Sequence, residues 1–143
     1  MITVNQFLLD SKKQTWIINS NKSVREALIL MKEKNIGCLI VVGDNQKLEG
    51  IFSERDYARK CVLAGLNSQD TKIHQLMSKN VITINGEEPI DACMQIMTDK
   101  RIRHLPVVKD QKILGIISIG DVVKIMISEQ RHLIDQLQKF ITT

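Results

Sequence analysis

The segment GIFSERD at residues 50–56 and the segment GIISIGD at residues 115–121 share one pattern, and this pattern decides the fold. In each segment a glycine and two apolar residues precede a Ser-x-x-Asp sequence. The apolar residues are typical of a strand, and Ser and Asp are preferred where a helix begins. Each segment therefore predicts a junction between a strand and a helix, and the chain contains that junction twice.

Upstream of each junction, apolar residues recur with helical spacing. The positions i, i+3, i+4 and i+7 are occupied by Val24, Ala27, Leu28 and Met31, and again by Ile90, Cys93, Met94 and Met97. This spacing predicts two amphipathic helices. Ser23 and Glu26 fit a capping box at the start of the first. The whole chain is therefore interpreted as a tandem repeat.

The remaining elements follow the same repeat. Residues 38–42 and 104–108 are nearly continuous apolar runs, which favour strands covered by helices. Short lead helices are expected near residues 4–8 and 73–77. We predict an α/β fold of the α+β type, built from two β-α-β-β-α units. Residues 1–68 form the first domain with its lead helix, and residues 69–143 form the second with a long C-terminal helix.

Composition excludes several classes of protein. With 143 residues, of which 43% are hydrophobic, the chain is in the range of an ordinary globular protein. The net charge of +4 is a weak bias toward anions, and an aromatic content of 3% is poor for stacking on single strands. Nucleic acid is therefore an improbable partner.

The cysteines and the N-terminus indicate a compartment. Cys38, Cys61 and Cys93 lie far apart among apolar residues, without the spacing of a zinc site or a disulfide framework. Neither a signal peptide nor a membrane-spanning run is recognisable. We expect reduced thiols in the core, no metal, no membrane association and a cytoplasmic location.

Catalytic motifs are not found in the sequence. His74, His104 and His132 are not placed near one another or near a cysteine at ligand spacing. The sequence has neither a nucleophile elbow nor a glycine-rich phosphate loop. We therefore expect a protein that is not an enzyme and has no catalytic cofactor.

The repeated Ser-x-x-Asp sequence has two interpretations. Ser53 with Asp56, and Ser118 with Asp121, can cap helices by satisfying free backbone amides. The same groups can bind a ligand, because amides and a hydroxyl hold phosphate while a carboxylate accepts ribose hydroxyl groups. Both interpretations are compatible with one another.

A second feature, Arg-His-Leu-Pro at residues 103–106, precedes a predicted strand. The guanidinium group of Arg103 is suited to phosphate, and His104 can donate to phosphate or stack on a base. The alternative explanation for this feature is an exposed entry to the strand. Arg55 adds a further cation at the first strand–helix junction.

Together, the repeated Ser-x-x-Asp units and the Arg-His-Leu-Pro-Val run resemble a tandem pair of cystathionine-β-synthase (CBS) domains, also called a Bateman module. The resemblance covers almost the whole chain and is closest to bacterial stand-alone CBS-domain proteins. It implies a pseudo-two-fold pair that binds an adenosine-containing ligand in clefts between the repeats. AMP, ATP or NAD(H) are the expected ligands, and S-adenosylmethionine is a less favoured one.

The resemblance also implies roles for individual residues. Asp121 and Asp56 would hold ribose hydroxyl groups, and Ser118 and Ser53 would hold phosphate. Arg103, His104 and Arg55 would supply charge to the phosphate. The walls around the adenine would come from Ile17, Thr83, Cys38, Leu39, Leu105 and Pro106. The first repeat has Gly37 and Cys38 where the second has Arg103 and His104, so unequal sites are expected.

These observations lead to one function and one alternative. We predict a regulatory sensor of adenine nucleotides that changes conformation on binding and acts on an unknown protein partner. The C-terminal helix has an apolar side that so small a domain does not obviously cover, which predicts a homodimer. The alternative is a structural or interaction module whose ligand cleft is degenerate.

Overall fold

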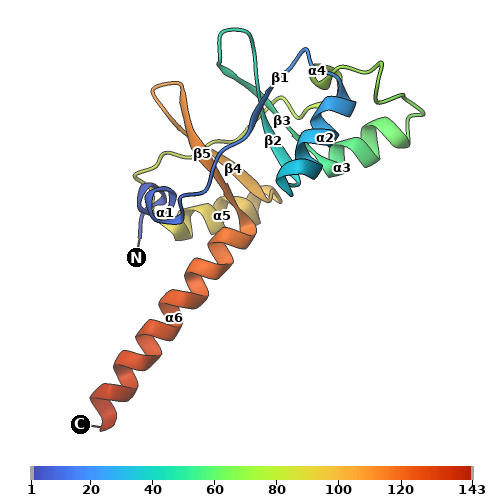
Figure 1. Cartoon of the computed structure of the whole chain (residues 1–143). Helices are drawn as coiled ribbons and strands as arrows, with labels where there is room; N and C mark the ends of the chain where they lie inside the picture. The colour runs from blue at the N-terminus through green and yellow to red at the C-terminus, as the bar shows by residue number, and fades with distance from the viewer. Residues whose placement is uncertain (1, 143) are drawn as a thin grey trace. The chain divides into compact units, whose positions relative to one another are not determined.

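The computed structural model describes residues 2–142 (Figure 1). The chain forms two compact units, which are described separately. The central unit contains Gln14–Ile82 and Lys109–Leu114. The C-terminal unit contains Met1–Lys13, Thr83–Val108 and Gly115–Thr143.

The central unit contains a three-stranded sheet with β1 (Ile17–Asn19), β2 (Cys38–Val42) and β3 (Leu48–Ser53) in that order. β1 is parallel to β2, and β2 is antiparallel to β3. Helix α2 (Val24–Lys34) connects the parallel strands, and α4 (Ile73–Leu76) follows later in the chain. After β3 come α3 (Glu54–Asp56) and a π-helical segment η1 (Tyr57–Val62).

The core of the central unit explains this arrangement. Every residue of β2 is buried, as the continuous apolar run predicted. The buried cluster also takes residues from α2, β3, η1 and α4: Val24, Ala27, Met31, Phe52, Cys61, Ile73 and Leu76. Helix α2 begins with the predicted capping box between Ser23 and Glu26. Helical spacing thus directs one face of α2 toward the sheet.

The C-terminal unit repeats these elements. It contains α1 (Val4–Ser11), α5 (Ile90–Lys100) and a two-stranded sheet of β4 (His104–Lys109) and β5 (Lys112–Ser118), followed by α6 (Ile119–Thr142). Its buried side chains correspond to those of the central unit and include Ile90, Cys93, Met97, Leu105, Val107, Ile117 and Val122. The predicted fold class, helix–strand repeats of the α+β type, is confirmed.

One strand differs between the repeats. The predicted β-α-β-β-α unit needs a first strand near Thr83 in the second repeat, but among the described residues this segment has only a single parallel bridge, between Ile84 and Val107. There, Ile84 donates to the Pro106 carbonyl at 3.0 Å, and Val108 donates to the Ile84 carbonyl at 3.0 Å. The next hydrogen bond toward Thr83 would use the backbone amide of residue 106. Proline has no amide hydrogen, so the ladder ends at Ile84.

The lead helices occupy exchanged positions. Thr3, which caps α1, forms a bridge with Pro89 at the start of α5. Lys72, which precedes α4, forms the corresponding bridge with Ser23 at the start of α2. Each lead helix therefore belongs to the unit that contains the amphipathic helix of the other repeat. The predicted boundary between residues 68 and 69 follows the sequence repeat, whereas the compact units follow this exchange.

Helix α6 is much longer than the corresponding helical segment of the first repeat. Its first part packs against α5, and it then extends beyond α1 and α5 (Figure 1). Every residue from 130 to 142 is exposed. Within residues 2–142, none of the helices has both the length and the apolar character needed to span a membrane.

Candidate functional site

The junction between β5 and α6 holds the second Ser-x-x-Asp sequence. The Ser118 amide donates to Asp121 Oδ2 at 2.9 Å, and the Asp121 amide donates to Ser118 Oγ at 3.1 Å. These reciprocal bonds cap the helix, as one of the two interpretations predicted. Between them lies Gly120, where an added Cβ would meet only Ser118 Oγ, at 3.7 Å. The first turn of α6 is therefore open on this side.

Asp121 has a further partner that the sequence did not indicate. Lys13, in the segment after α1, places its Nζ 2.8 Å from Asp121 Oδ2. Burial opposes ionisation of Asp121, but the bonds from Lys13 and Ser118 outweigh it and lower the pKa of this carboxyl. Among the described residues, none forms a hydrogen bond with Asp121 Oδ1, and the side chain is 18% exposed. The carboxylate is therefore ionised and has an open oxygen.

Arg103 and His104 lie beside this junction. The Ile119 amide donates to the Arg103 carbonyl at 2.8 Å, which joins the start of β4 to the start of α6. Burial and the positive charge of Lys13 lower the pKa of His104, and Asp121 opposes them. His104 is therefore a neutral imidazole near pH 7, with one donor and one acceptor nitrogen. The structure places Arg103, His104, Ser118 and Asp121 at one junction.

The predicted adenine walls of the C-terminal unit are only partly close to this junction. Leu105 is fully buried in β4, and Pro106 follows it in the same strand. Thr83 is exposed and lines a pocket of about 370 Å³ beside α5. The lining of this pocket consists of Thr83, Ile84, Asn85, Glu88, Ala92, Gln95 and Ile96. The pocket therefore includes Thr83 but none of the junction residues.

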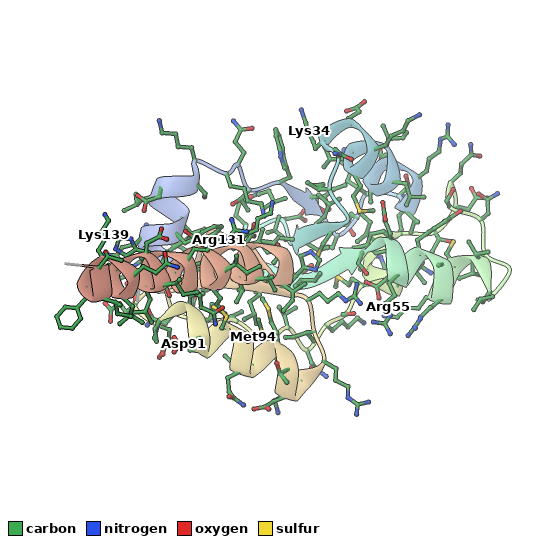
Figure 2. The ribbon with its side chains drawn as sticks, turned by 90° about the horizontal axis from the view of Figure 1, so that it is seen from below. Lys34, Arg55, Asp91, Met94, Arg131 and Lys139 are labelled. Atoms are coloured by element: carbon green, nitrogen blue, oxygen red, sulfur yellow. The ribbon has the colours of Figure 1, made fainter. Side chains whose placement is uncertain are left out.

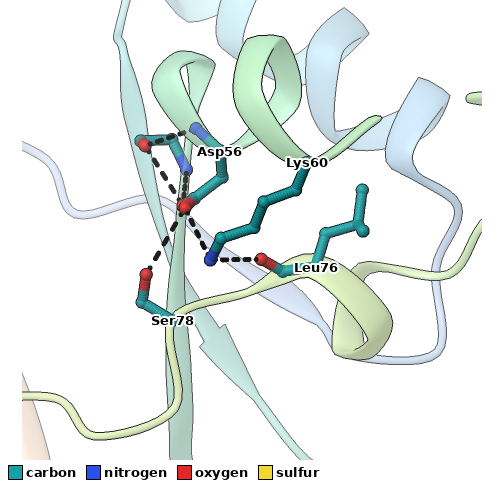
Figure 3. A network of polar contacts seen from close by, with 5 residues as sticks. Asp56, Lys60, Leu76 and Ser78 are labelled. Atoms are coloured by element: carbon teal, nitrogen blue, oxygen red, sulfur yellow. Dashed lines mark hydrogen bonds and ion pairs between the residues drawn. The ribbon is translucent and has the colours of Figure 1, made fainter. Parts of the chain in front are cut away.

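The first Ser-x-x-Asp sequence forms a closed network in the central unit (Figure 3). Asp56 Oδ2 accepts the Ser53 amide at 3.0 Å and the Ser53 hydroxyl at 3.1 Å. Asp56 Oδ1 accepts the Ser78 hydroxyl at 3.4 Å and is 3.0 Å from Lys60 Nζ. Lys60 also donates to the Leu76 carbonyl at 3.0 Å. Both oxygens of Asp56 are therefore engaged, and the residue is buried.

The other predicted residues of the central unit are distributed along its sheet. Cys38 pairs with Ser53 and Leu39 with Phe52, so both lie at the strand end that leads into α3. Burial, with a smaller effect of Asp56, raises the pKa of Cys38 to about 12. Ile17 pairs with Ile40 at the start of β1 and is 41% exposed. Arg55 is exposed on α3 (Figure 2) and takes no part in the Asp56 network.

Sequence reasoning missed Lys13, Lys60 and Ser78. Lys60 follows Asp56 by four residues, a spacing that places two side chains on one helical face. The sequence therefore contained an indication for that pair. Lys13 is distant from Asp121 along the chain and lies in an irregular segment, so no spacing rule predicts their contact. Residues 2–142 contain no cluster of ligands suited to a metal ion.

Comparison with known proteins identifies the repeats. The CBS domain family matches residues 12–62 and 73–128. A candidate signal-transduction protein with CBS domains from Burkholderia ambifaria MC40-6 is 42% identical, with a TM-score of 0.84 over 90% of this chain and 96% of that one. A hexameric CBS-CP12 protein from bloom-forming cyanobacteria is 27% identical, with a TM-score of 0.76 over 86% of this chain and 70% of that one.

A curated relative supports the same assignment. The mitochondrial CBS domain-containing protein CBSX3 of Arabidopsis thaliana is 39% identical over 132 residues, which are 89% of this chain. This chain spans 64% of the length of that protein. Because both repeats match the family model and carry corresponding strand–helix junctions, the chain belongs to the CBS-domain family and contains two CBS domains in tandem.

Proposed function

We propose that this chain is a regulatory module that binds an adenine nucleotide, AMP, ATP or NAD(H), through the junction around Asp121. S-adenosylmethionine is a less favoured ligand. The observation that supports this function best is the open, ionised carboxylate of Asp121 at the start of α6. Asp121 Oδ1 is free of hydrogen bonds from the rest of the described chain, so it can accept a ribose hydroxyl group.

The groups around Asp121 suit the phosphate of the same ligand. Lys13, Arg103 and the first turn of α6 supply positive potential, and Gly120 leaves that turn accessible. Free amides at a helix N-terminus and basic side chains are common partners of phosphate. His104 adds a neutral donor. Leu105 and Pro106, in the same strand, remain the proposed apolar walls for the adenine.

The first junction is proposed to contribute less to binding. Asp56 is surrounded by Ser53, Ser78 and Lys60, so a ligand must displace existing bonds before it reaches the carboxylate. At the position that corresponds to Gly120, the first repeat has Arg55. These differences favour a structural role for Ser53 and Asp56 and a dominant ligand site at Asp121. Ile17, Cys38 and Leu39 remain proposed contacts of the weaker site.

The proposed regulation uses association rather than catalysis. Beyond residue 129, α6 exposes Leu133, Ile134, Leu137 and Ile141, and exposed apolar stripes of this kind indicate a partner. We propose a homodimer through α6, in which ligand binding at the start of the helix biases the position of its far part. The hexameric cyanobacterial relative shows that CBS proteins of similar fold associate.

The proposal also includes a cellular compartment and a protein that this module regulates. Three buried, reduced cysteines fit a reducing compartment, and we propose the cytoplasm. The regulated protein is proposed to recognise the change in α6. Neither catalysis nor a nucleic-acid partner is part of the proposal.

Native mass spectrometry of the purified protein, combined with a thermal-shift screen, tests this function. Ligand present at about 100 times its dissociation constant stabilises a fold by roughly 2.7 kcal/mol, which corresponds to a rise of several degrees in Tm. We expect this rise with at least one of AMP, ATP and NADH. If neither these ligands nor S-adenosylmethionine raises Tm, and no ligand co-purifies, the structural alternative replaces the sensor function.

A further inference from the structure

Lys13 and Lys60 each pair with the aspartate of a Ser-x-x-Asp sequence, but they are held differently. Lys60 lies on the same helical segment as Asp56 and is fixed a second time by the Leu76 carbonyl. Lys13 comes from an irregular segment between α1 and β1, and Asp121 is the only acceptor found for its Nζ among residues 2–142. Lys13 is therefore the more easily exchanged of the two cations.

The Lys13–Asp121 pair is also open to solvent. The Lys13 side chain is 36% exposed and that of Asp121 is 18% exposed. Exposed ion pairs are weak, because water solvates both charges well and the long lysine side chain loses freedom when it is held. Asp121 Oδ1 has no hydrogen bond within residues 2–142, so a ligand hydroxyl group can bond to it, and Lys13 can leave Oδ2 at low cost. The lysine stem then allows the ammonium group to turn toward a neighbouring anion.

The surroundings of this pair favour an anion. Asp121 is the acidic residue that acts on His104, whereas Lys13 and Arg103 act on the same imidazole with positive charge. Once a hydroxyl group of a ligand occupies Asp121, the group consists of two cations beside the first turn of α6. In this turn the Ile119 and Asp121 amides already have acceptors, and among the described residues the Gly120 amide has none. The negative α-phosphate of a nucleotide can neutralise the positive charges of Lys13 and Arg103. An unphosphorylated nucleoside has no negative group that can do so.

We propose that Lys13 is a phosphate-binding residue that makes this site prefer nucleotides over nucleosides. This inference rests on the proposed function, because it concerns the same site at Asp121. Lys13 exchanges Asp121 for the phosphate when a nucleotide binds. With adenosine, Lys13 gains no new partner and stays on Asp121 Oδ2. The lysine therefore raises the affinity for nucleotides and leaves the affinity for adenosine unchanged.

The test compares Lys13→Met with the wild-type protein by calorimetric titration with AMP and with adenosine. A charge-assisted bond to phosphate corresponds to roughly a 10- to 150-fold change in affinity. We expect the affinity for AMP to fall within this range, while the affinity for adenosine does not fall. The affinity for AMP divided by the affinity for adenosine should then be at least about tenfold lower in Lys13→Met than in the wild-type protein.

Lys12→Met is the matched control, because it removes the same charge one residue away. We expect this variant to keep the wild-type ratio of affinities. If Lys12→Met lowers the ratio of AMP to adenosine affinity as much as Lys13→Met does, the effect comes from net charge and the proposed role of Lys13 is overturned. A lower Tm of Lys13→Met with an unchanged ratio would leave only a structural ion pair. If the wild-type protein binds none of AMP, ATP, NADH, S-adenosylmethionine and adenosine, the proposed function itself fails, and the inference fails with it.

Discussion

At the scale of single residues, Asp56 and Asp121 show that one motif can have two physical roles. Each caps a helix through a serine three residues earlier. Asp56 is buried with both oxygens engaged, whereas Asp121 has one oxygen that is free of hydrogen bonds within residues 2–142. The difference arises from neighbours outside the motif, namely Ser78 and Lys60 for Asp56 and Lys13 for Asp121.

The two aspartates are therefore expected to differ in their effect on stability. Asp56→Ala removes the acceptor of Ser53, Ser78 and Lys60 at a buried position, and should lower the free energy of unfolding by about 1–3 kcal/mol. Asp121→Ala removes a helix cap and an exposed ion pair, and should lower the free energy of unfolding by about 1 kcal/mol. Urea unfolding of both variants measures the difference. A larger loss for Asp121→Ala would contradict the description of Asp56 as the structural residue.

The buried thiols make a prediction about alkaline pH. Burial raises the pKa of Cys38 to about 12 and that of Cys93 to about 11, from an ordinary value of 9.0. A thiol whose pKa is raised by folding contributes its stability below pH 9 and loses it as the pH rises toward the folded pKa. Between pH 9 and pH 10 the free energy of unfolding should fall by about 1 kcal/mol for each of these thiols.

The double variant Cys38→Ala, Cys93→Ala is the control for this prediction. It should be less stable than the wild-type protein at pH 7, because buried atoms are lost. Its stability should nevertheless fall less steeply from pH 9 to pH 10 in urea unfolding. An identical slope in both proteins would assign the alkaline loss to other groups.

At the scale of elements, the sequence predicts the two repeats. It does not predict how the repeats differ in their first strand or that their lead helices are exchanged. The spacing of Val24 and Met31 predicts α2, and that of Ile90 and Met97 predicts α5, because helical periodicity is a local property. The strand expected at Thr83 did not form, because Pro106 lacks the amide that the ladder needs. Exchange of the lead helices depends on contacts between distant segments, such as Thr3 with Pro89, which no local pattern specifies.

The candidate site was predictable to a similar extent. Ser118, Asp121, Arg103 and His104 could be proposed from the sequence, because they belong to motifs that recur within the chain or resemble a family. Lys13 was missed, because its place beside Asp121 is set by the exchange that packs α1 in the C-terminal unit. The sequence therefore proposes the carboxylate but not the cation that pairs with it.

Helix α6 provides the prediction at this scale. Leu137 lies on the exposed apolar stripe, and Ser128 lies on the opposite side of the helix. Leu137→Lys should convert the proposed homodimer into a monomer in sedimentation experiments, because it places a charge in the apolar interface. Ser128→Lys adds the same charge and should leave the dimer unchanged. A stable dimer in Leu137→Lys, or a monomeric wild-type protein, would exclude α6 as the proposed interface.

At the scale of the whole molecule, the chain contains two CBS domains whose junctions have diverged. The first junction ends in a short helix, a π-helical segment and a closed polar network. The second begins a helix of 24 residues with an open carboxylate at its start and an apolar stripe at its end. This division favours one dominant ligand site that is connected directly to the proposed association helix.

Calorimetric titration with AMP, ATP and NADH tests the central claim most directly, with the wild-type protein, Asp121→Ala and Asp56→Ala compared below their melting temperatures. The account predicts binding by the wild-type protein to at least one of these ligands. Asp121→Ala should weaken it by roughly 10- to 150-fold, which corresponds to the loss of bonds to a charged acceptor, and Asp56→Ala should weaken it less. If Asp121→Ala binds as well as the wild-type protein while Asp56→Ala does not bind, the assignment of the dominant site to Asp121 is contradicted.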